Sequence, residues 1–515
     1  MDMGKLLRKI FRKNKLPERR ESMRECGVLM HITSLPGPYG VGTMGKRAFE
    51  FVDFLADAGQ SWWQILPLSP TGYGDSPYQS ASAYAGNPYL IDLDLLKAQG
   101  LVTQQELDSF VWCHSEEKVD YGLLYENRWK VLRLCYGRFA GGEDFEEFCR
   151  ENESWLADYA LFMAIKQAKG GASWYTWEDS LKRRQSQALD EARHTYADEI
   201  RFQSFVQYLF ARQWQALRAY ANAKGIRFIG DVPIYVPLDS VEVWSKPELF
   251  QLDEGLNPTA VAGCPPDAFS EDGQLWGNPL YRWDVMARDG YAWWIRRMAA
   301  AGKLYDMVRL DHFRGFEAYW AVPYGDTTAK NGRWIKGPDH DFIETLLKQL
   351  PGLSLIAEDL GFLTEEVLAL RDDFNLPGMK VLGFAFDSRE PSDYLPHTYP
   401  QNSVCYTGTH DNMTTRQWFE TASPDAVAYA KEYMALTEEE GYVWGMIRSA
   451  YSSVSRLAIV PMQDFLCLGP NSRMNFPGTL TDCNWTWRAK DDIMSCALGE
   501  KMLKLAVLYG RKILK

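Results

Sequence analysis

Three acidic residues, Asp311, Glu358 and Asp411, each stand at the end of a short apolar segment of the chain. Apolar segments of this length that stop abruptly at polar residues are typical of buried strands. Parallel strands of a barrel share one direction, so acids at their carboxyl ends would meet at one mouth. Single acids at strand ends are common, but three that converge are costly to assemble without a chemical use.

Arg309 precedes Asp311 by two positions, so both side chains lie on the same face of a strand. A guanidinium beside a carboxylate keeps that carboxylate ionised, which suits a nucleophile near neutral pH. The alternative is an ion pair that only orders a loop. His312 and His410, which adjoin Asp311 and Asp411, add further polar groups to the cluster and favour a chemical role.

Two kinds of chemistry suit such a cluster. In glycosidic bond cleavage, an ionised carboxylate attacks the anomeric carbon while a protonated one delivers a proton to the leaving oxygen. In a metal centre, the Asp, Glu and His side chains would hold a divalent cation. The guanidinium of Arg309 would repel that cation, and the sequence has no His-x-x-x-His or similar ligand spacing. The residues therefore favour glycosidic chemistry over a metal centre, and we expect no metal and no cofactor.

Eight strand-like segments alternate with helical segments, which predicts an α/β fold, a closed (β/α)8 barrel with large, mainly helical insertions. A buried carboxylate such as Asp231, inside the third strand, needs an Arg, a His or a ligand hydroxyl as its partner. Helices are expected at 49–59, 199–224, 339–350, 364–374 and 424–453. The predicted strands are residues 27–35, 62–68, 226–236, 307–310, 354–361, 380–386, 403–411 and 456–465.

A single catalytic barrel domain is predicted over residues 25–515. Residues 92–198 are dense in helix-forming side chains, which predicts a helical insertion between barrel strands. Residues 245–283 collect Pro, Gly, Asp and aromatic residues, which predicts a long substrate-groove loop. Residues 1–24 form a basic leader that we expect to be a flexible tail rather than an amphipathic surface helix.

The composition excludes several classes of protein. With 515 residues and a net charge of −12, the chain lacks the basic surface of a nucleic-acid binder. No stretch approaches the roughly 18 apolar residues of a membrane span. The nine cysteines, an odd number without a Cys-x-x-Cys pair, fit reduced thiols in a cytoplasmic protein rather than a disulfide framework or a zinc site. Aromatic residues make up 14% of the chain, and rings such as Tyr73 and Tyr78 in the loop at 69–89 suit stacking on carbohydrate.

Five motifs together give a specific resemblance to a known family. They are GDSPYQS at 74–80, GQLWGNPLY at 273–281, VRLDHFRGFEAYW at 308–320, AEDLG at 357–361 and GTHDN at 408–412. Over about residues 25–510 the sequence resembles the 4-α-glucanotransferases, the amylomaltases or disproportionating enzymes of glycoside hydrolase family 77 in the α-amylase-like clan. The basic leader lies outside this resemblance.

The resemblance implies a role for each site residue. Asp311 would be the nucleophile, Glu358 the general acid/base and Asp411 the transition-state stabiliser. The remaining positions would bind substrate: Arg309, His312, His410 and Asp231 at the donor sugar, Tyr78, Asp267, Gln274, Trp276 and Asn475 along the glucan groove, and Tyr73 at a secondary glucan site.

The implied activity is transfer of an α-1,4-glucan segment to the 4-hydroxyl of another glucan or of glucose, by a retaining double displacement through a covalent glucosyl-enzyme. Maltooligosaccharides and longer α-1,4-glucans would be the substrates. Tyr78 and Trp276 favour transfer, because a ring that stacks an acceptor sugar excludes water. The alternatives are an α-1,4-glucan hydrolase, which would share the same acids, and a non-catalytic glucan-binding barrel.

Overall fold

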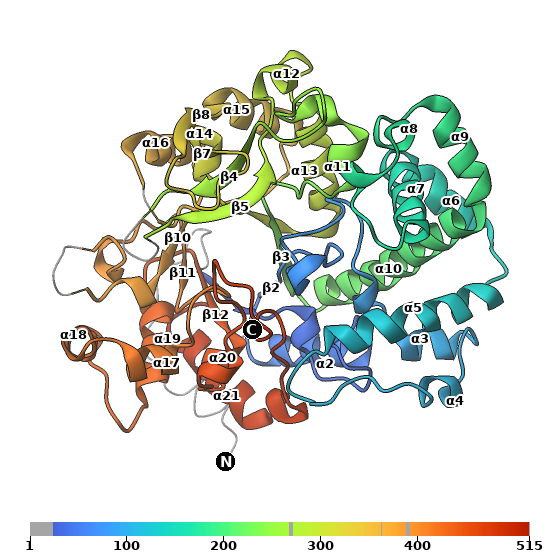
Figure 1. The fold of residues 1–515 in the computed structure, drawn as a ribbon. Coiled ribbons are helices and arrows are strands. Elements are labelled where there is room, and N and C mark those ends of the chain that lie inside the picture. Colours follow the sequence, from blue (N-terminus) through green and yellow to red (C-terminus); the bar gives the residue numbers. More distant parts are fainter. Residues whose placement is uncertain (1–23, 267–270, 362, 388–391, 514–515) are drawn as a thin grey trace.

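The predicted barrel is present. The computed structural model describes residues 24–513 except 267–270, 362 and 388–391, and in it eight parallel strands close into a barrel in the order β1-β12-β11-β10-β9-β6-β3-β2 (Figure 1). Each barrel strand begins within two residues of the start of a predicted strand. The strands are β1 (Glu25–Leu29), β2 (Trp62–Gln64), β3 (Arg227–Val232), β6 (Met307–Leu310), β9 (Leu355–Ala357), β10 (Gly378–Val381), β11 (Ser403–Tyr406) and β12 (Leu457–Pro461).

Most of these strands end several residues earlier than predicted. The first apolar segment continues as a 3-10 helix, η1 (Ile32–Ser34), and the last continues as α20 (Met462–Phe465). The apolar run outlasts the strand because the loops at the carboxyl ends are themselves buried; Ile65 and Leu66, just beyond β2, are 0% and 1% exposed. The chain therefore turns inside the core, and polar site residues follow at the turn.

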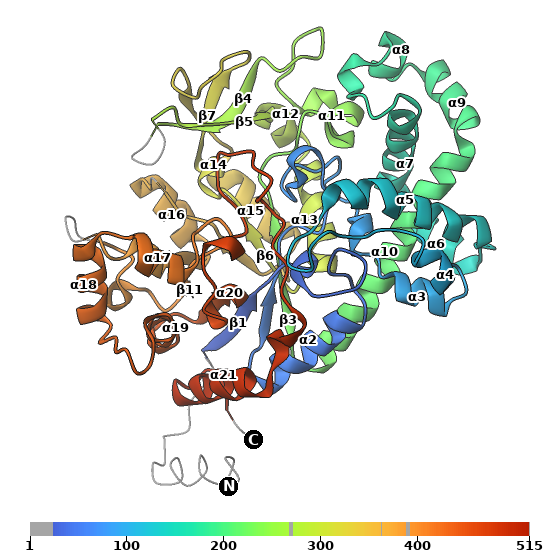
Figure 2. The same cartoon turned by 60° about the horizontal axis from the view of Figure 1, so that its bottom comes forward.

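Helices pack around the outside of the barrel (Figure 2). The helix between β1 and β2 shows how: the ring of Phe51 in α2 meets the indole of Trp63 in β2 edge to face, with centroids 4.8 Å apart. Buried apolar residues recur along such helices at the spacing that one packed face requires. The helices that follow barrel strands include α2 (Lys46–Asp57), α10 (Ala197–Ala223), α13 (Ala292–Leu304), α15 (Asp339–Gln349), α16 (Glu365–Asp373), α19 (Tyr442–Ser452) and α21 (Cys496–Leu508).

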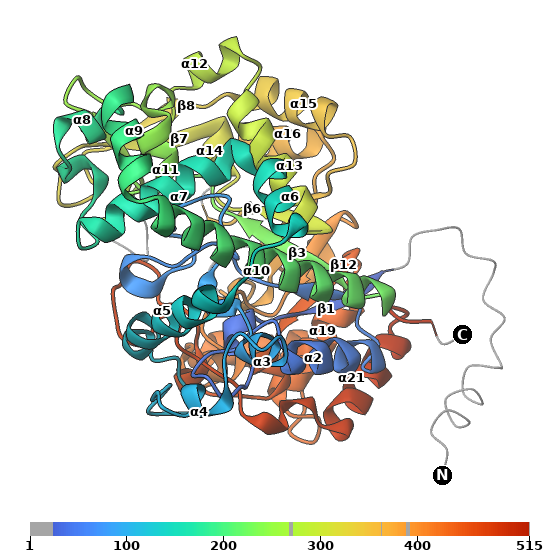
Figure 3. The same ribbon diagram turned by 90° about the vertical axis from the view of Figure 1, so that its right-hand side faces the viewer.

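The segment 92–198 consists of helices and loops between β2 and β3. It packs on α10, whose other side contacts β3 and α2, so α10 joins this segment to the barrel (Figure 3). Aromatic pairs make much of this contact; the rings of Phe139 and Phe205 are 4.6 Å apart. The helices of the segment are α3 (Leu93–Ala98), α4 (Gln104–Leu107), α5 (Tyr121–Arg138), α6 (Glu143–Glu151), α7 (Glu153–Ala168), α8 (Asp179–Lys182) and α9 (Ser186–Thr195).

A small antiparallel sheet lies above the barrel, where the sequence predicted only a loop at 245–283. Its strand order is β5-β4-β7-β8. Two strands come from the predicted loop and two from the segment after the VRLDHFRG motif, so the pairing is long-range and is not visible in the local composition. The strands are β4 (Ala260–Cys264), β5 (Gln274–Pro279), β7 (Ala318–Pro323) and β8 (Arg333–Lys336), with α11 (Val241–Ser245), α12 (Trp283–Arg288) and α14 (Arg314–Glu317) beside them.

The helix predicted at 424–453 is two helices, α18 (Pro424–Tyr433) and α19, preceded by α17 (Thr415–Thr421). α18 ends just before Ala435, whose φ is 49°, and Gly441, whose φ of 83° glycine adopts without strain, directly precedes α19. None of the helices in the described part of the chain is long and apolar enough to cross a membrane.

Candidate active site

The three predicted acids lie at one mouth of the barrel. Asp311 directly follows β6, Glu358 directly follows β9, and Asp411 lies in the loop after β11. Strands β6 and β9 are hydrogen-bonded neighbours with Leu310 opposite Ala357, so Asp311 and Glu358 leave adjacent strand ends side by side. Closure of the barrel brings together side chains that are 100 positions apart in the sequence, because parallel strands end at the same rim.

Arg309 links two carboxylates beneath this mouth. Its Nη1 donates to Asp231 Oδ2 at 2.7 Å and to Asp311 Oδ1 at 2.8 Å. The side chains of Arg309 and Asp231 are 4% and 1% exposed, whereas that of Asp311 is 27% exposed. Asp231 thus has the Arg partner that its burial required, and Asp311 is the carboxylate of the pair that a substrate can reach.

Glu358 has the opposite protonation preference. Burial, with a further contribution from the charge of Asp311, raises the pKa of Glu358 to about 8, although Arg309 and two backbone N–H groups oppose the rise. Those donors are the backbone nitrogens of His312, 2.7 Å from Oε2, and of Leu360, 3.0 Å from Oε1. The site therefore holds a carboxyl whose pKa burial raises, beside a second carboxyl that is paired with a guanidinium.

Tyr78 joins the loop after β2 to the other side of the site. Its hydroxyl donates to Asp231 Oδ2 at 2.7 Å and lies 2.9 Å from His410 Nε2, and its ring stacks on the His410 ring with centroids 5.3 Å apart. Because the single phenol proton goes to Asp231, the hydrogen bond to His410 requires a proton on Nε2 of the imidazole. The same Nε2 is 3.4 Å from Asp411 Oδ2, so the imidazole N–H is directed between the phenol and the carboxylate.

Asp411 is held from the segment after β12. Asn475 Nδ2 donates to Asp411 Oδ1 at 2.6 Å, and the backbone N–H of Asn475 donates to the carbonyl of His410 at 3.1 Å. Arg473 fixes both partners, since its Nη2 donates to the carbonyl of Asp411 and its Nε to that of Asn475, each at 2.7 Å. Asp411 remains 40% exposed, with one carboxylate edge fixed and the other open to the mouth.

Trp276 and Gln274 come from β5 of the small sheet. The Trp276 indole donates to Gln274 Oε1 at 3.1 Å and meets the His312 ring edge to face at 4.7 Å. Burial lowers the pKa of His312 to about 4, so this imidazole is neutral, and its Nε2 is buried without a hydrogen-bond partner in the described residues. The small sheet thus places the indole of Trp276 and the amide of Gln274 at the rim above Asp311.

Two of the predicted residues have side chains that the structure does not describe. Asp267 lies outside the described residues. Tyr73 lies in a 3-10 helix, η2 (Tyr73–Asp75), in the loop that also carries Tyr78.

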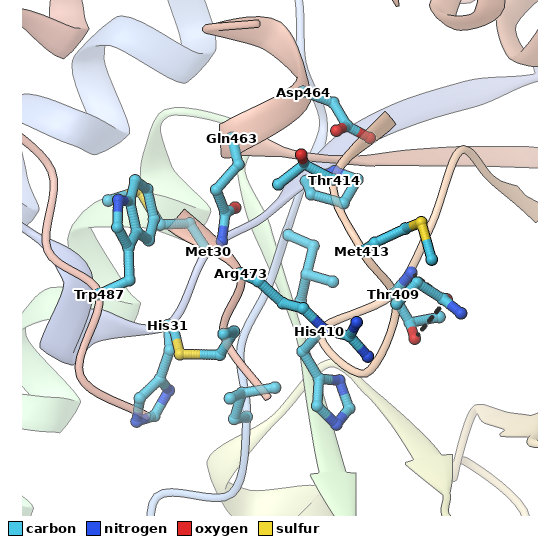
Figure 4. A pocket seen from close by; sticks show the side chains of 15 residues that line it. Met30, His31, Thr409, His410, Met413, Thr414, Gln463, Asp464, Arg473 and Trp487 are labelled. Carbon is cyan, nitrogen blue, oxygen red and sulfur yellow. Dashed lines mark hydrogen bonds between the residues drawn. The ribbon is translucent and has the colours of Figure 1, made fainter. Parts of the chain in front are cut away.

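Sequence reasoning missed several residues around the cluster. Arg473 orders both Asn475 and Asp411, as described above, and Met379 Sδ lies 3.4 Å from Arg309 Nε. A pocket between the ends of β1, β11 and β12 is lined by His31, His410, Gln463, Asp464 and Arg473 among others (Figure 4). His31, two residues beyond β1, and Asp464, three residues beyond β12, each follow an apolar strand, and that position was the signal that could have found them.

The guanidinium of Arg309 lies between Asp231 and Asp311, where a metal ion would otherwise be needed to balance the two carboxylates. Within the described residues, no three His, Cys, Asp or Glu side chains are grouped so that they could hold a metal ion.

Comparisons with known proteins agree with this arrangement. The model of the family described as 4-alpha-glucanotransferase matches residues 30–494. The chain is 49% identical to the 4-alpha-glucanotransferase of Clostridium butyricum, over 94% of this chain and 100% of that protein. It is 50% identical to the Thermus thermophilus 4-alpha-glucanotransferase, over 94% of this chain and 99% of the other.

Among solved structures, the amylomaltase from Streptococcus agalactiae in complex with acarbose superposes with a TM-score of 0.93. It is 42% identical, and the match covers 95% of this chain and 100% of that one. The sequence matches extend over nearly the whole of each relative, so they include the barrel, the small sheet and the helices between β2 and β3. The chain belongs to the 4-α-glucanotransferase family.

Proposed function

We propose that this 4-α-glucanotransferase works by a retaining double displacement in which Asp311 is the nucleophile and Glu358 the general acid/base. The observation that carries the proposal is the contrast between the two carboxyls. Asp311 is paired with Arg309 at 2.8 Å, whereas burial raises the pKa of Glu358 to about 8. A retaining mechanism needs one carboxyl of each kind, and the two must flank the scissile bond.

In the first step Asp311 attacks the anomeric carbon of the donor glucan, and Glu358 gives its proton to the leaving 4-oxygen. A covalent glucosyl ester on Asp311 forms and the leaving glucan departs with the proton. In the second step the ionised Glu358 takes the proton of an acceptor 4-hydroxyl, whose oxygen attacks the anomeric carbon, and the bond from that carbon to Asp311 breaks and frees the carboxylate. Atoms and charges balance without any cofactor.

Asp411 would stabilise the distorted donor sugar in the transition state. Its fixed carboxylate edge, held by Asn475 at 2.6 Å, leaves the other edge free to accept hydrogen bonds from sugar hydroxyls. The imidazole N–H of His410 and the unpartnered Nε2 of His312 would bind further hydroxyls on either side. Such groups act most strongly where they need no reorganisation.

Maltooligosaccharides and longer α-1,4-glucans would be the donors, and glucose or another glucan the acceptor. Tyr78 and Trp276 favour an acceptor sugar over water, because a stacked ring both excludes water and raises the effective concentration of the acceptor. Asp267 and Tyr73 stay in this proposal as groove and secondary-site residues on the strength of the motifs alone. The nine cysteines form no disulfide in the described part of the chain, which supports a reducing compartment, and we place the reaction in the cytoplasm.

The test is incubation of the purified protein with maltotriose, with free glucose and longer maltooligosaccharides measured together. We expect a ladder of longer chains that disappears in Asp311→Asn and persists in Asp190→Asn, a change at an exposed acid of α9. Glucose and maltose without longer products would make the protein a hydrolase. Full activity in Asp311→Asn would refute the role of Asp311, and no reaction of the wild type would favour the glucan-binding alternative.

A further inference from the structure

We infer that Asp464 is a positioning residue for the reaction, which holds the Gly408–Thr414 loop so that His410 and Asp411 face the donor sugar. The inference rests on the proposed function, because it assigns to Asp464 a role through Asp411. Asp464 itself is 1% exposed and lies in α20, directly after the last barrel strand, so it acts on the loop from beneath.

The carboxylate of Asp464 binds both ends of the loop. Its Oδ2 accepts hydrogen bonds from the hydroxyls of Thr407, at 2.6 Å, and Thr415, at 2.7 Å, and its Oδ1 accepts the backbone N–H of Thr415 at 2.7 Å. Thr407 is the first residue after β11, and Thr415 is the first residue of α17. The seven residues between them therefore start and finish on one side chain.

Other contacts order the interior of the loop but do not join its ends. Asn412 Oδ1 accepts the backbone N–H and the hydroxyl of Thr409, at 2.8 and 2.9 Å. Figure 4 shows Asp464 at the Thr414 end of the loop and His410 at the opposite side of the pocket. A shift of the loop ends at Thr407 and Thr415 would therefore also move His410 and Asp411.

The buried carboxylate makes this anchoring strong. Burial raises the pKa of Asp464, while the two hydroxyls and the N–H group oppose the rise. A carboxylate out of contact with water is stable only while its hydrogen-bond donors stay in place. Displacement of either loop end would leave the carboxylate unsatisfied, so the energy of the buried charge opposes that displacement.

Substitutions at Asp464 separate positioning from simple stability. Asp464→Ala removes all three hydrogen bonds. Asp464→Asn keeps an oxygen for the N–H of Thr415, and its amide can donate to the two threonine hydroxyls, which also accept hydrogen bonds. Thr415→Val removes one hydroxyl and leaves the backbone N–H in place, so it weakens the anchor with little change in shape.

The experiment measures kcat and KM for maltotriose disproportionation together with thermal unfolding. For Asp464→Ala we expect kcat to fall about tenfold to a hundredfold, since small misplacements of catalytic groups have effects of that size, with KM changed by less than about threefold. Asp464→Asn should recover most of the loss, and Thr415→Val should show a smaller fall than Asp464→Ala. An unchanged kcat in Asp464→Ala, or no recovery in Asp464→Asn, would overturn the inference.

Asp306→Ala is the matched control. Asp306 accepts hydrogen bonds from Arg218, Asn222 and the backbone of Phe228, so its loss also removes three bonds, but it lies at the amino-terminal end of β6, away from the catalytic mouth. We expect it to lower the unfolding temperature without lowering kcat at temperatures where the protein is folded. If it lowers kcat as much as Asp464→Ala does, the effect is one of stability and the inference fails.

A double-mutant cycle with Asp411→Asn distinguishes this inference from the proposed function. With an α-maltosyl fluoride donor, which needs no protonation of its leaving group, residual turnover can be compared in all four proteins. If Asp464 acts through Asp411, Asp464→Ala should cost much less in the Asp411→Asn background than in the wild type. Equal losses in both backgrounds would refute the inference, whereas full activity of Asp411→Asn alone would refute the role of Asp411.

Discussion

The charge of Asp311 should control the acidity of Glu358, and Asp311→Asn measures that control. Asparagine has nearly the same shape as aspartate but carries no charge. In this respect it resembles the glucosyl ester that Asp311 would form, which is also uncharged. Burial is the largest cause of the raised pKa of Glu358 and would persist in the variant, but the repulsion from Asp311 would disappear. Glu358 should therefore become more acidic, which is what its change from acid to base requires.

The size of the effect follows from Coulomb's law. Burial and the charge of Asp311 raise the pKa of Glu358 to about 8. Two carboxylates about 5 Å apart, the separation typical of retaining enzymes, repel each other by about 3 kcal/mol at an effective dielectric constant of about 20. That energy corresponds to about two pH units. Burial and the other groups would account for the remainder, so the pKa of Glu358 in Asp311→Asn should fall but stay above its usual value.

The assay is direct titration of the side-chain carboxyl by NMR in protein labelled with ¹³C at the glutamate carboxyls, with Glu358→Gln used to identify the resonance. In the wild type, kcat/KM for maltotriose should also fall about tenfold per pH unit above pH 8, as Glu358 loses its proton. A wild-type Glu358 that titrates near 4.5 would contradict the acid role. A resonance that titrates at the same pH in Asp311→Asn would show that the two carboxyls are not coupled.

Three further predictions concern single contacts. Tyr78→Phe removes the hydroxyl bonded to Asp231 and should lower kcat about tenfold with little change in unfolding temperature; steady-state kinetics would contradict this if only KM rose. Burial raises the pKa of Glu242 to about 7, so the folded protein binds a proton that the unfolded chain releases between about pH 4.5 and 7, and stability falls as pH rises through that window. Glu242→Gln should remove up to about 3 kcal/mol of the decrease in the free energy of unfolding, measured by urea unfolding at pH 5 to 8. If the free energy of unfolding of the variant depends on pH as that of the wild type does, the prediction is wrong. Gly378→Ala would put a Cβ 2.3 Å from Asp359 Oδ2 and should destabilise the protein by about 2 kcal/mol or more. An unchanged unfolding temperature in calorimetry would contradict this prediction.

The barrel and its three acids were predictable because a buried parallel strand can be recognised from its own short stretch of sequence. A strand covered on both sides needs a continuous apolar run, and the run stops where the chain reaches the mouth. Asp311 and Glu358 stand at that stop, one residue beyond β6 and β9. The direction of the strands then brings the acids together without any knowledge of long-range contacts.

Contacts between distant loops were not predictable in the same way. Tyr78 meets Asp231 and His410 across 153 and 332 positions of the sequence, and no local pattern in the loop at 69–89 specifies those partners. The small sheet was missed for a similar reason, since its inner strand β4 is short, rich in small residues, and paired with β5 on one side and with β7, some 60 residues later, on the other. Such strands depend on their neighbours rather than on their own composition.

A single cation gives the carboxyls at the mouth their different chemistry. Arg309 Nη1 is shared by Asp231 and Asp311, yet only Asp311 reaches the open side of the site, so the charge that Arg309 maintains is available to a substrate at one position only. Glu358 is held by backbone N–H groups instead of a side-chain cation, and these do not offset its burial. Replacement of Arg309 by an uncharged side chain would therefore do more than remove one ion pair. It would leave Asp231 buried without its cation, and it would raise the pKa of Glu358 further, because the charge of Arg309 is the main influence that lowers it.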